Sequence, residues 1–409
     1  MNERRPRVLV VAQRLPRPVR GGVDLRVEQT IGALAEIGEV GVVGITPSVH
    51  GAGTPSGVRL WRSVEPTLGD NRDEAPASIA WLRTPGGHPS DRWWTPSAAA
   101  VVAEAISDFA PDAVVLEHLW MRRALDVARA AGCPAVLDEH NVEALLHEEL
   151  VDLSGHDGPP KGLARRLAVR TAEIEAATIR SVDQIWAASD EDALELRARY
   201  QPAASVHMIP NSVDVDPAPI SDRGIRPPVL LFPAAFGYPP NMAAALWLLR
   251  EVLPLVRDRL AEATLVLAGH APPASLQRLA RGVPGVTITG TVPDMAPYFA
   301  AATVLPVPLV VGGGTRIKVL EAFAAGIPVV STRKGVEGIV AQPDRDFLPA
   351  GTGAQFADAI VRLALDPELA RSIATNARTL VAERYSRRAT TGLIRAALSE
   401  LGLSIQVPQ

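Results

Sequence analysis

The sequence predicts an α/β protein made of two domains, each built around a parallel sheet. The chain has 409 residues, which exceeds one typical core and suits two domains of roughly 200 residues. Short β-branched runs alternate with longer helical patterns along the whole chain, as they do in βαβ units. A stretch with four prolines, residues 211–228, separates two halves of similar architecture and is interpreted as a linker.

Each half begins with an apolar strand followed by a loop containing proline and glycine. In the first half we expect strands at Val8–Ala12, Val40–Ile45, Ala113–Leu116, Ala135–Leu137, Gln184–Ala188 and Val206–Ile209. Helices between them include Asp24–Ile37, Ser97–Phe109 and Lys161–Ser181. In the second half we expect strands at Val229–Ala234, Thr264–Ala268, Val286–Thr289, Thr303–Pro306 and Pro328–Ser331. Ligands of open parallel sheets bind beyond the carboxyl ends of the strands, so the two sheets are expected to face a central cleft.

Composition excludes several classes of protein. A net charge of −4 argues against a general nucleic-acid binder. Cys133 is the only cysteine, so the chain forms no internal disulfide and a cytoplasmic location fits best. We expect no signal peptide, because the N-terminal apolar run Val8–Ala12 has only the length of a strand and is followed by Arg14. We expect no membrane span, because the longest apolar candidate, Ala300–Val311, is interrupted by Pro306 and Pro308. Peripheral contact with a membrane surface stays open.

A glycine pair follows the first strand. The loop after Gln13 reaches Gly21 and Gly22, and a helix begins near Asp24. Glycines let backbone approach a ligand closely, and the N–H groups at a helix start attract anions. The pair does not form GxGxxG, so a tight turn explains it equally well and both interpretations stay open.

Charged and imidazole side chains follow two neighbouring strands of the first half. Glu117 and His118 come after one strand, and Asp138, Glu139, His140 and Asn141 come after the next. Burying such groups is costly unless they are solvated or used. For each histidine the residues allow two interpretations, a ligand contact or a hydrogen bond within its own loop.

Two other kinds of site find little support in the residues. His140, Glu143 and His147 have helical spacing, but HExxH is absent and no Cys or His cluster accompanies them. We therefore expect no metal ion. GxSxG is also absent, and Ser189 stands where a helix cap belongs, which argues against a Ser-His-Asp triad.

The most informative segment is 307–332, which reads VPLVVGGGTRIKVLEAFAAGIPVVST. A strand ends near Pro308, three glycines follow, and Thr315 is placed to cap a helix that ends before Gly326. The glycines leave N–H groups unobstructed where the helix dipole is positive, which predicts an anion site at Gly313, Gly314 and Thr315.

Three side chains of the predicted helix suit a nucleoside diphosphate. Arg316 and Lys318 add positive charge, enough to balance a diphosphate without a metal. Glu321 lies six residues after Thr315, roughly 9 Å along a helix, where the ribose would lie. Its carboxylate could accept hydrogen bonds from two ribose hydroxyls, although a glutamate on the surface of an amphipathic helix is the alternative.

The whole chain resembles glycosyltransferase family 4, retaining enzymes of the GT-B fold. The similar segments follow the family's order: RPVRGGVDLRVEQTIGALAEIG, VLDEHNVE, AASDEDALEL, HMIPNSVDV, ATLVLAG, VTITGTVPDM and GGGTRIKVLEAFAAGIPVVSTRKGVEGI. The last segment is highly specific and the others are moderately so. The resemblance implies Rossmann-like domains at 1–211, on the acceptor side, and at 212–386, on the nucleotide-sugar side. It also implies a final helix, 387–409, that crosses back onto the first domain.

The resemblance implies roles for particular positions. Gly21 and Gly22 would place backbone against the donor diphosphate, and His140 would bind the transferred sugar. Gly314 and Thr315 would offer amides to the sugar or the phosphates, and Gly313, Arg316 and Lys318 are further donor-binding candidates beside them. Glu321 would hold the ribose, and Thr291 and Val292 would contact the nucleobase through backbone. His140 and Glu321 are the candidate catalytic residues.

The chain departs from the family pattern at two places. Many relatives have Glu-x7-Glu, and the first of these positions is Gly313 here. Many also carry an Arg and a Lys after the first strand of the second domain, where this chain has Ala235 and Asn241. We hypothesise that Arg316 and Lys318 supply the missing positive charge.

The residues and the resemblance together predict a transferase that moves a sugar from a nucleoside-diphosphate donor to a hydroxyl acceptor, with no cofactor. The resemblance implies that the anomeric configuration is retained. The acceptor, a saccharide, a lipid-linked sugar or a natural product, is expected on the first domain. Its candidate contacts are Glu117, His118, Trp120 and Asn141, and nearby tryptophans (Trp81, Trp93 and Trp94) serve equally well as core residues. The alternatives are an epimerase or a phosphorylase of the same fold, or a non-catalytic accessory protein.

Overall fold

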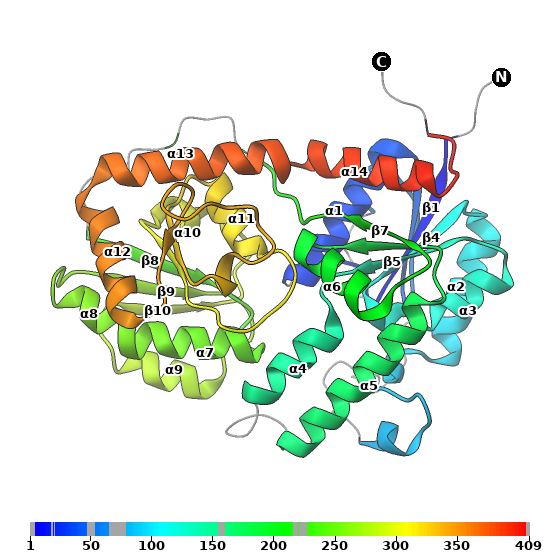
Figure 1. Ribbon diagram of the computed structural model, residues 1–409, viewed down its shortest axis with the longest axis horizontal. Coiled ribbons are helices and arrows are strands. Elements are labelled where there is room, and N and C mark those ends of the chain that lie inside the picture. Colours follow the sequence, from blue (N-terminus) through cyan, green and yellow to red (C-terminus); the bar gives the residue numbers. More distant parts are fainter. Residues whose placement is uncertain are drawn as a thin grey trace. The chain divides into compact units, whose positions relative to one another are not determined.

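The structure is a computed structural model and describes residues 5–17, 19, 21–46, 54–64, 79–153, 160–215, 220 and 227–405 (Figure 1). The chain forms two compact units. Unit 1 comprises Met1–Pro210 and Thr390–Gln409, and unit 2 comprises Asn211–Ala389. Both units are layered α/β structures whose paired strands all run parallel, which confirms the predicted fold class.

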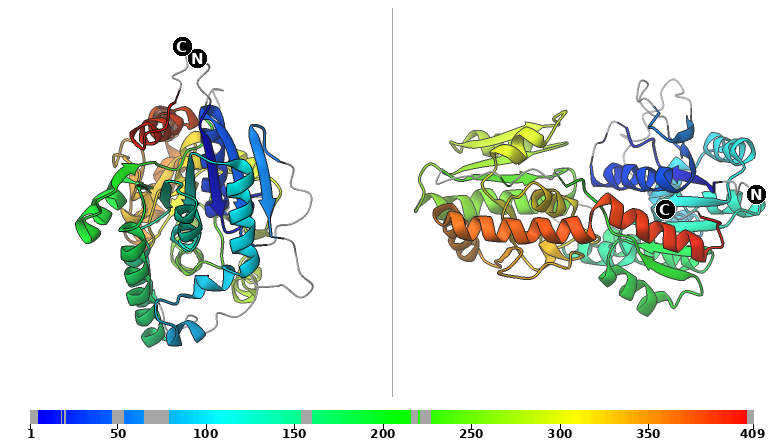
Figure 2. Two further views of the ribbon diagram at one scale, coloured as in Figure 1. Left: turned by 90° about the vertical axis from the view of Figure 1, so that its right-hand side faces the viewer. Right: turned by 90° about the horizontal axis from the view of Figure 1, so that it is seen from above.

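Unit 1 contains a seven-stranded parallel sheet in the order β3-β2-β1-β4-β5-β6-β7. Figure 2 shows β3 at the edge of this sheet. The strands are β1 (Arg7–Ala12), β2 (Glu39–Gly44), β3 (Val58–Ser63), β4 (Ala113–Glu117), β5 (Ala135–Glu139), β6 (Gln184–Ala187) and β7 (Ser205–Met208).

Helices cover both faces of this sheet, which explains why its strands are apolar at consecutive positions. In β1, Leu9 and Val11 pack against one set of helices, and Val8 and Val10 pack against another. The first set includes α2 (Pro96–Phe109), α3 (Ala124–Ala130), α6 (Asp190–Tyr200) and the end of α5 (Lys161–Ile179). The second consists of α1 (Gly22–Ile37) and α14 (Arg387–Glu400), which lie side by side (Figure 2).

The remaining helical segments in the described part of unit 1 are one α-helix and three short 3-10 segments. Helix α4 (Glu143–Leu153) packs alongside α5 (Figure 1). Three short 3-10 segments complete the unit, η1 (Ala80–Arg83), η2 (Pro89–Trp93) and η3 (Leu119–Met121).

Unit 2 has two three-stranded parallel sheets, β10-β9-β8 and β11-β12-β13. A parallel bridge between Leu230 and Val304 joins β8 to the start of β11, so the strands form one continuous layer. The strands are β8 (Val229–Pro233), β9 (Thr264–Ala268), β10 (Val286–Gly290), β11 (Leu305–Val307), β12 (Val329–Ser331) and β13 (Leu348–Pro349).

One continuous hydrophobic core holds unit 2 together, and Phe232, Phe323 and Phe356 are fully buried in it. The helices around it are α7 (Pro239–Trp247), the π segment η4 (Leu248–Val252), α8 (Leu253–Arg257), α9 (Ala274–Arg281), α10 (Ala296–Ala301), α11 (Ile317–Ala324), α12 (Gly353–Leu365) and α13 (Pro367–Arg384). A 3-10 turn, η5 (Lys334–Val336), follows β12.

All eleven strands and the three named helices expected from sequence are present within a few residues of their predicted limits. The sequence analysis missed β3, because its residues are mostly half-exposed and lack an apolar period. It also missed β13, which has only two residues.

The stretch interpreted as a linker is partly ordered into unit 2. Val213 forms a parallel bridge with Ser386, and its N–H donates to the carbonyl of Tyr385 at 2.9 Å. Residues 216–219 and 221–226 lie outside the described part of the chain. Among the helices that the structure describes, none combines the length and the apolar character that a membrane crossing requires.

Candidate active site

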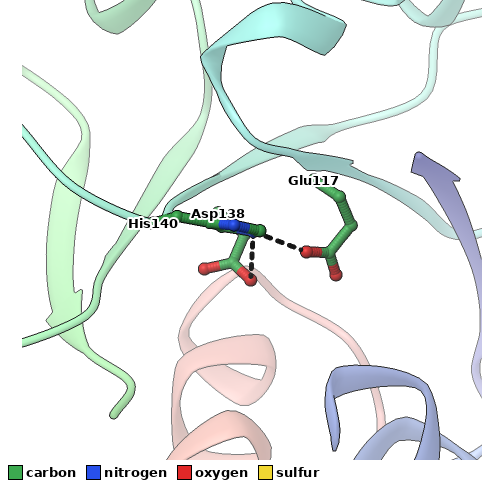
Figure 3. A group of neighbouring side chains, drawn as sticks. All are labelled: Glu117, Asp138 and His140. Atoms are coloured by element: carbon green, nitrogen blue, oxygen red, sulfur yellow. Dashed lines mark hydrogen bonds and ion pairs between the residues drawn. The ribbon is translucent and has the colours of Figure 1, made fainter. Parts of the chain in front are cut away.

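The first group of candidate residues lies at the carboxyl ends of β4 and β5. Because these strands are parallel and Glu117 is in register with Asp138, their terminal side chains meet at one edge of the sheet. His140 follows β5 and turns its ring toward both carboxyl groups (Figure 3). All three side chains are buried. The structure thus brings together two sequence-predicted site residues, Glu117 and His140.

Asp138 is paired with a buried arginine from α1. Arg26 Nε lies 3.1 and 3.2 Å from the two carboxylate oxygens of Asp138, and its Nη2 lies 2.5 Å from Oδ1. Arg26 also donates to the carbonyl of Ile209 at 2.9 Å. Burial raises the pKa of Asp138 to about 6, although Arg26 opposes that rise. No local sequence pattern marks Arg26 as a site residue, because 112 residues separate it from its partner.

Glu117 and His140 form the second pair. His140 Nε2 lies 3.0 Å from Glu117 Oε2 and 3.9 Å from Asp138 Oδ2. Burial raises the pKa of Glu117 to about 7 and lowers the pKa of His140 to about 3, because a buried site disfavours the charged form of each group. The imidazole is therefore neutral near pH 7, and the carboxyl group is close to its titration midpoint.

Within the described residues, Glu117, Asp138 and His140 are the one group of His, Cys, Asp and Glu side chains with the spacing of a metal site, their ligand atoms lying within 4.8 Å of one another. Arg26 already neutralises Asp138 here. A divalent cation at this point would meet the positive charge of that guanidinium. The arrangement favours pairing among the protein's own groups.

The four acceptor candidates lie in one neighbourhood of unit 1, where they contact protein groups. His118 has a positive φ of 79°, its N–H donates to the carbonyl of Asp138 at 2.9 Å, and its Nε2 lies 3.3 Å from Glu143. Asn141 also donates to Glu143, at 2.8 Å. Glu117 contacts His140, as described above. The positive φ of His118 is a strained backbone conformation for a residue other than glycine, and such residues are often found at functional sites.

Trp120 is the half-buried centre of an aromatic group. The rings of His88 and His118 stack on its indole with centroid distances of 4.5 and 5.0 Å, and His147 meets it edge-on at 6.0 Å. Burial lowers the pKa of His88 to about 3 and of His147 to about 4, so these rings are neutral. Trp81 is buried, and Trp93 and Trp94 pack against the core.

A cluster of buried acidic residues, Glu139, Glu143 and Glu175, adjoins His118 and Asn141. The carboxylate of Glu175 accepts the backbone N–H groups of Glu143 and Ala144 at 2.6 and 3.2 Å and so caps the first turn of α4. Tyr200 donates its hydroxyl to Glu175 at 2.5 Å. Burial raises the pKa of Glu139 well above its usual value, with Glu175 adding to the rise. Sequence analysis noted Glu139 and Glu143 but not Glu175, which lies in the middle of a long helix.

The glycine pair lies at the start of α1. Gly21 occupies the cap position with an extended φ of 176°, and its carbonyl accepts the N–H of Leu25 at 3.1 Å. A Cβ at Gly21 would meet no atom within 4 Å. Open space beside a helix start is compatible with an approaching ligand.

The glycine-rich turn of unit 2 connects β11 to α11. Gly312 and Gly314 have positive φ values of 136° and 65°, which glycine adopts without strain. The expectation that Thr315 caps the helix is wrong, because α11 begins at Ile317 and Arg316 occupies the cap position with no side-chain cap bond. Asn211, which sequence analysis gave no role, donates to the carbonyl of Thr315 at 3.1 Å.

Arg316 is buried and directed into the turn. Its Nη1 donates to the carbonyls of Gly313 and Gly314, the second at 3.1 Å, and its Nη2 donates to the carbonyl of Lys334 at 3.3 Å. Nη2 also lies 3.6 Å from Glu337. The guanidinium therefore bridges carbonyl groups of the turn and of Lys334.

Lys318 and Glu321 lie on α11 and have perturbed pKa values. Lys318 Nζ donates to Asn241 Oδ1 at 2.9 Å and lies 4.2 Å from the ring centroid of Phe232. Burial lowers the pKa of Lys318 to about 7, with Arg316 adding to the fall. Burial also raises the pKa of Glu321 to about 7, and Lys318 opposes that rise. Strongly shifted groups of this kind cluster at functional sites.

The two nucleobase candidates follow β10. Thr291 is exposed, and its Oγ1 lies 3.0 Å from His270 Nδ1. Val292 is half-buried. Both positions follow the carboxyl end of a strand, where ligands of parallel sheets bind.

Solved structures of similar fold are glycosyltransferases and related enzymes. Sucrose-phosphate synthase from Thermosynechococcus elongatus aligns with a TM-score of 0.73 at 16% identity, covering 97% of this chain and 99% of that one. HepE from Anabaena, solved with UDP and glucose, gives 0.65 at 14% identity over 97% and 100% of the two chains. A glycosyltransferase from Rickettsia africae gives 0.61 at 14% identity over 98% and 100%. At these identities the likeness establishes the fold.

A comparison with curated protein sequences finds no match. Two protein-family models do match, one in each half of the chain. The model "Glycosyl transferase 4-like domain" matches residues 21–212, and "Glycosyl transferases group 1" matches residues 227–366. Their order along the chain and the parallel α/β architecture of both units agree with a GT-B enzyme. This chain belongs to the GT-B glycosyltransferases of the group 1, family 4-like type.

Proposed function

We propose that this enzyme transfers a sugar from a nucleoside-diphosphate sugar to a hydroxyl group, with retention of anomeric configuration. The observation that carries the proposal is the constellation on α11. A glycine turn with two positive φ angles precedes the helix, and a half-buried ammonium, Lys318, and a half-buried carboxyl, Glu321, follow within two helical turns, both with shifted pKa values. Peptide N–H groups and an ammonium suit a diphosphate, and a carboxylate suits a ribose.

On the donor side, the N–H groups of Gly313, Gly314 and Thr315 and the ammonium of Lys318 would bind the diphosphate. The position of Lys318 supports this role. Its ammonium is hydrogen-bonded to Asn241, the position at which many relatives carry a lysine, so it lies beside the place of that lysine's positive charge. The other cation of the original hypothesis, Arg316, would act by shaping the turn. Glu321 would hold the ribose.

Further donor contacts are proposed for positions that follow strands. Thr291 and Val292 would contact the nucleobase, and Gly21 and Gly22 would pack against the diphosphate. UDP-glucose is the first donor to try, because HepE has been solved in complex with it.

In the reaction, the bond between the anomeric carbon and the diphosphate oxygen breaks, and a bond from the same carbon to the acceptor oxygen forms. The acceptor proton would pass to a phosphate oxygen of the departing diphosphate. Negative charge grows on the leaving group in the transition state, so amides and Lys318 held in place would stabilise that state more than the ground state. His140 would contact the transferred sugar. With these groups supplying the positive charge, no metal ion is required.

The acceptor would bind unit 1 near the polar end of β4 and β5. Glu117, His118, Trp120 and Asn141 lie there, and Trp120 contributes an indole that is half-buried. A saccharide, a lipid-linked sugar and a natural product remain the candidate acceptors.

A donor panel followed by a transfer assay tests this function. UDP-, GDP- and dTDP-sugars would be screened by thermal shift, and the best would be assayed for nucleoside-diphosphate release in the presence of a chelator. Lys318→Met should weaken donor binding by about ten- to a hundredfold, because a hydrogen bond to a charged group contributes about 1.5–3 kcal/mol. Arg250→Met, which removes an exposed positive charge from the same unit, should leave binding unchanged.

The outcome that contradicts the function is a protein that no nucleotide sugar stabilises. Full activity in Lys318→Met would contradict the assignment of the anion site while leaving the transferase activity in place. Loss of activity on chelation would contradict the metal-free mechanism. Inversion at the anomeric carbon of the product, seen by proton NMR, would contradict retention.

A further inference from the structure

His140 is held at only one of its two ring nitrogens. Its Nε2 faces Glu117 Oε2 at 3.0 Å and Asp138 Oδ2 at 3.9 Å (Figure 3). Among the residues that the structure describes, no hydrogen bond reaches Nδ1. The ring thus has an anchored nitrogen and a second nitrogen that the protein leaves available.

The two carboxyl groups beside Nε2 are not equivalent. Asp138 is engaged by the guanidinium of Arg26 through both Nε and Nη2. Glu117 lies closer to the ring by almost an ångström, and its other oxygen, Oε1, is buried without a partner. His140 is therefore the principal hydrogen-bond partner of Glu117, and Arg26 is the principal partner of Asp138.

We propose that Glu117 is a positioning residue, which holds His140 by Nε2, sets the tautomer of its imidazole and reserves Nδ1 for the sugar. Glu117 has so far been an acceptor candidate only. This inference rests on the proposed function, in which His140 contacts the transferred sugar, because that contact is what Nδ1 would make.

The chemistry follows from where the shared proton lies. An ionised Glu117 accepts a hydrogen bond from Nε2–H, so Nδ1 carries a lone pair and accepts a hydrogen bond from a sugar hydroxyl. A protonated Glu117 donates its O–H to Nε2, so Nδ1 carries the hydrogen and becomes a donor. The state of Glu117 therefore decides what His140 offers to the sugar.

Glu117 lies among groups from α1, from β5 and from the segment that follows β5. Arg26 and Thr30 approach from α1, Asp138 approaches from β5, and His140 follows β5. Burial raises the pKa of Glu117 to about 7, and Arg26, Asp138 and Thr30 each oppose that rise. The tautomer of His140 should accordingly change near neutral pH.

Long-range proton–nitrogen NMR of the histidine-labelled full-length protein tests the inference without substrate. The His140 signals would be assigned from the spectrum of His140→Asn. At about pH 8.5, where Glu117 is ionised, the ring should carry its hydrogen on Nε2. A ring with its hydrogen on Nδ1 at that pH would overturn the proposal, and this measurement needs no Glu117 variant.

Glu117→Gln tests the same point by substitution. The amide does not titrate, so the change of tautomer between about pH 6 and about pH 8.5 should disappear. Glu191→Gln is the matched control, since Glu191 is exposed on α6 of the same unit, and it should keep the change. A pH-dependent tautomer that persists in Glu117→Gln would refute the role of Glu117.

Kinetics separate this inference from the proposed function. Glu117→Gln should lower kcat/KM for the nucleotide sugar about ten- to a hundredfold, as loss of an orienting partner typically does, and should leave the affinity for the nucleoside diphosphate, which lacks the sugar, nearly unchanged. Should His140→Ala keep the full rate, the role of His140 in the proposed function would be wrong, whereas the NMR result would still decide whether Glu117 sets the tautomer.

Discussion

At the scale of single residues, burial decides the charge state of the groups assigned to chemistry. Glu117, Lys318 and Glu321 all have pKa values moved to about 7, and in each the largest cause is desolvation. Groups with such values change their charge on small changes of environment. A bound diphosphate beside Lys318 is such a change, because its negative charge favours the ammonium.

The first consequence is a pH optimum for donor binding. Lys318 must be protonated to bind a diphosphate, and its lowered pKa means that the free enzyme loses this proton above about pH 7. Glu321 must be ionised to accept ribose hydroxyls, and its raised pKa means that the free enzyme gains a proton below about pH 7. Donor affinity should therefore be highest near pH 7 and fall on both sides.

Calorimetry with a nucleotide sugar, whose diphosphate does not titrate near neutrality, measures this profile. Affinity should fall up to tenfold per pH unit on each limb, with proton uptake on binding above about pH 7 and proton release below it. Lys318→Met should flatten the alkaline limb and Glu321→Gln the acidic limb. An affinity that stays constant from about pH 6 to about pH 9 in the native enzyme would show that neither group contacts the donor.

Sequence alone indicated the candidate residues that follow strands and the helix after the glycine turn. Glu117, His140 and Lys318 were identified because the ends of parallel strands and a glycine-to-helix junction have recognisable patterns. Arg26 and Asn211 were not, because each contacts a partner more than a hundred residues away and no local pattern marks such a pair.

At the scale of elements, the junction of β11 and α11 shows how a turn is held in shape. Gly312 and Gly314 supply the backbone angles, and Arg316 ties the carbonyls of Gly313 and Gly314 from inside. A Cβ on Gly312 would come within 3.1 Å of the Arg316 guanidinium, so the two residues depend on each other. Arg316 thus bridges carbonyls of the turn.

This arrangement predicts that Arg316 acts through geometry. Arg316→Met should weaken nucleoside-diphosphate binding about tenfold, because a neutral side chain no longer bridges the turn. Arg316→Lys should weaken it by a similar factor, since a lysine keeps the charge but lacks the planar fork that reaches several carbonyls. Calorimetry of both variants decides between the two roles. Native affinity in Arg316→Lys would show that charge alone matters and would restore Arg316 as a phosphate ligand.

The wrong prediction that Thr315 caps α11 has a physical origin. Threonine is a favoured cap, and the sequence offers Thr315 just before an apolar helical pattern. In the structure the carbonyl of Thr315 is used by Asn211 and the helix begins two residues later, after Arg316. Tertiary contacts outweighed a local preference. The edge strand β3 was not predicted, because its half-exposed residues lack an apolar period. In the structure it forms through pairing with β2.

At the scale of the whole molecule, the chain divides into two compact units that are discontinuous in sequence. The last residues, from Thr390 onward, belong to unit 1, where Ile394, Ala397 and Leu398 are fully buried beside α1. Gln184 of β6 donates to the carbonyl of Ala397 at 2.8 Å, which anchors this helix to the sheet. Short apolar runs were enough to predict all strands except β3 and β13, because strands covered on both faces are apolar at consecutive positions.

The proposed mechanism depends on the leaving diphosphate binding at the start of α11. A crystal structure of the enzyme with the nucleotide sugar that stabilises it most tests that claim directly. We expect phosphate oxygens within hydrogen-bonding distance of the N–H groups of Gly314 and Thr315 and of Lys318 Nζ, with the ribose hydroxyls on Glu321. A diphosphate bound at another place, with the glycine turn empty, would contradict the account.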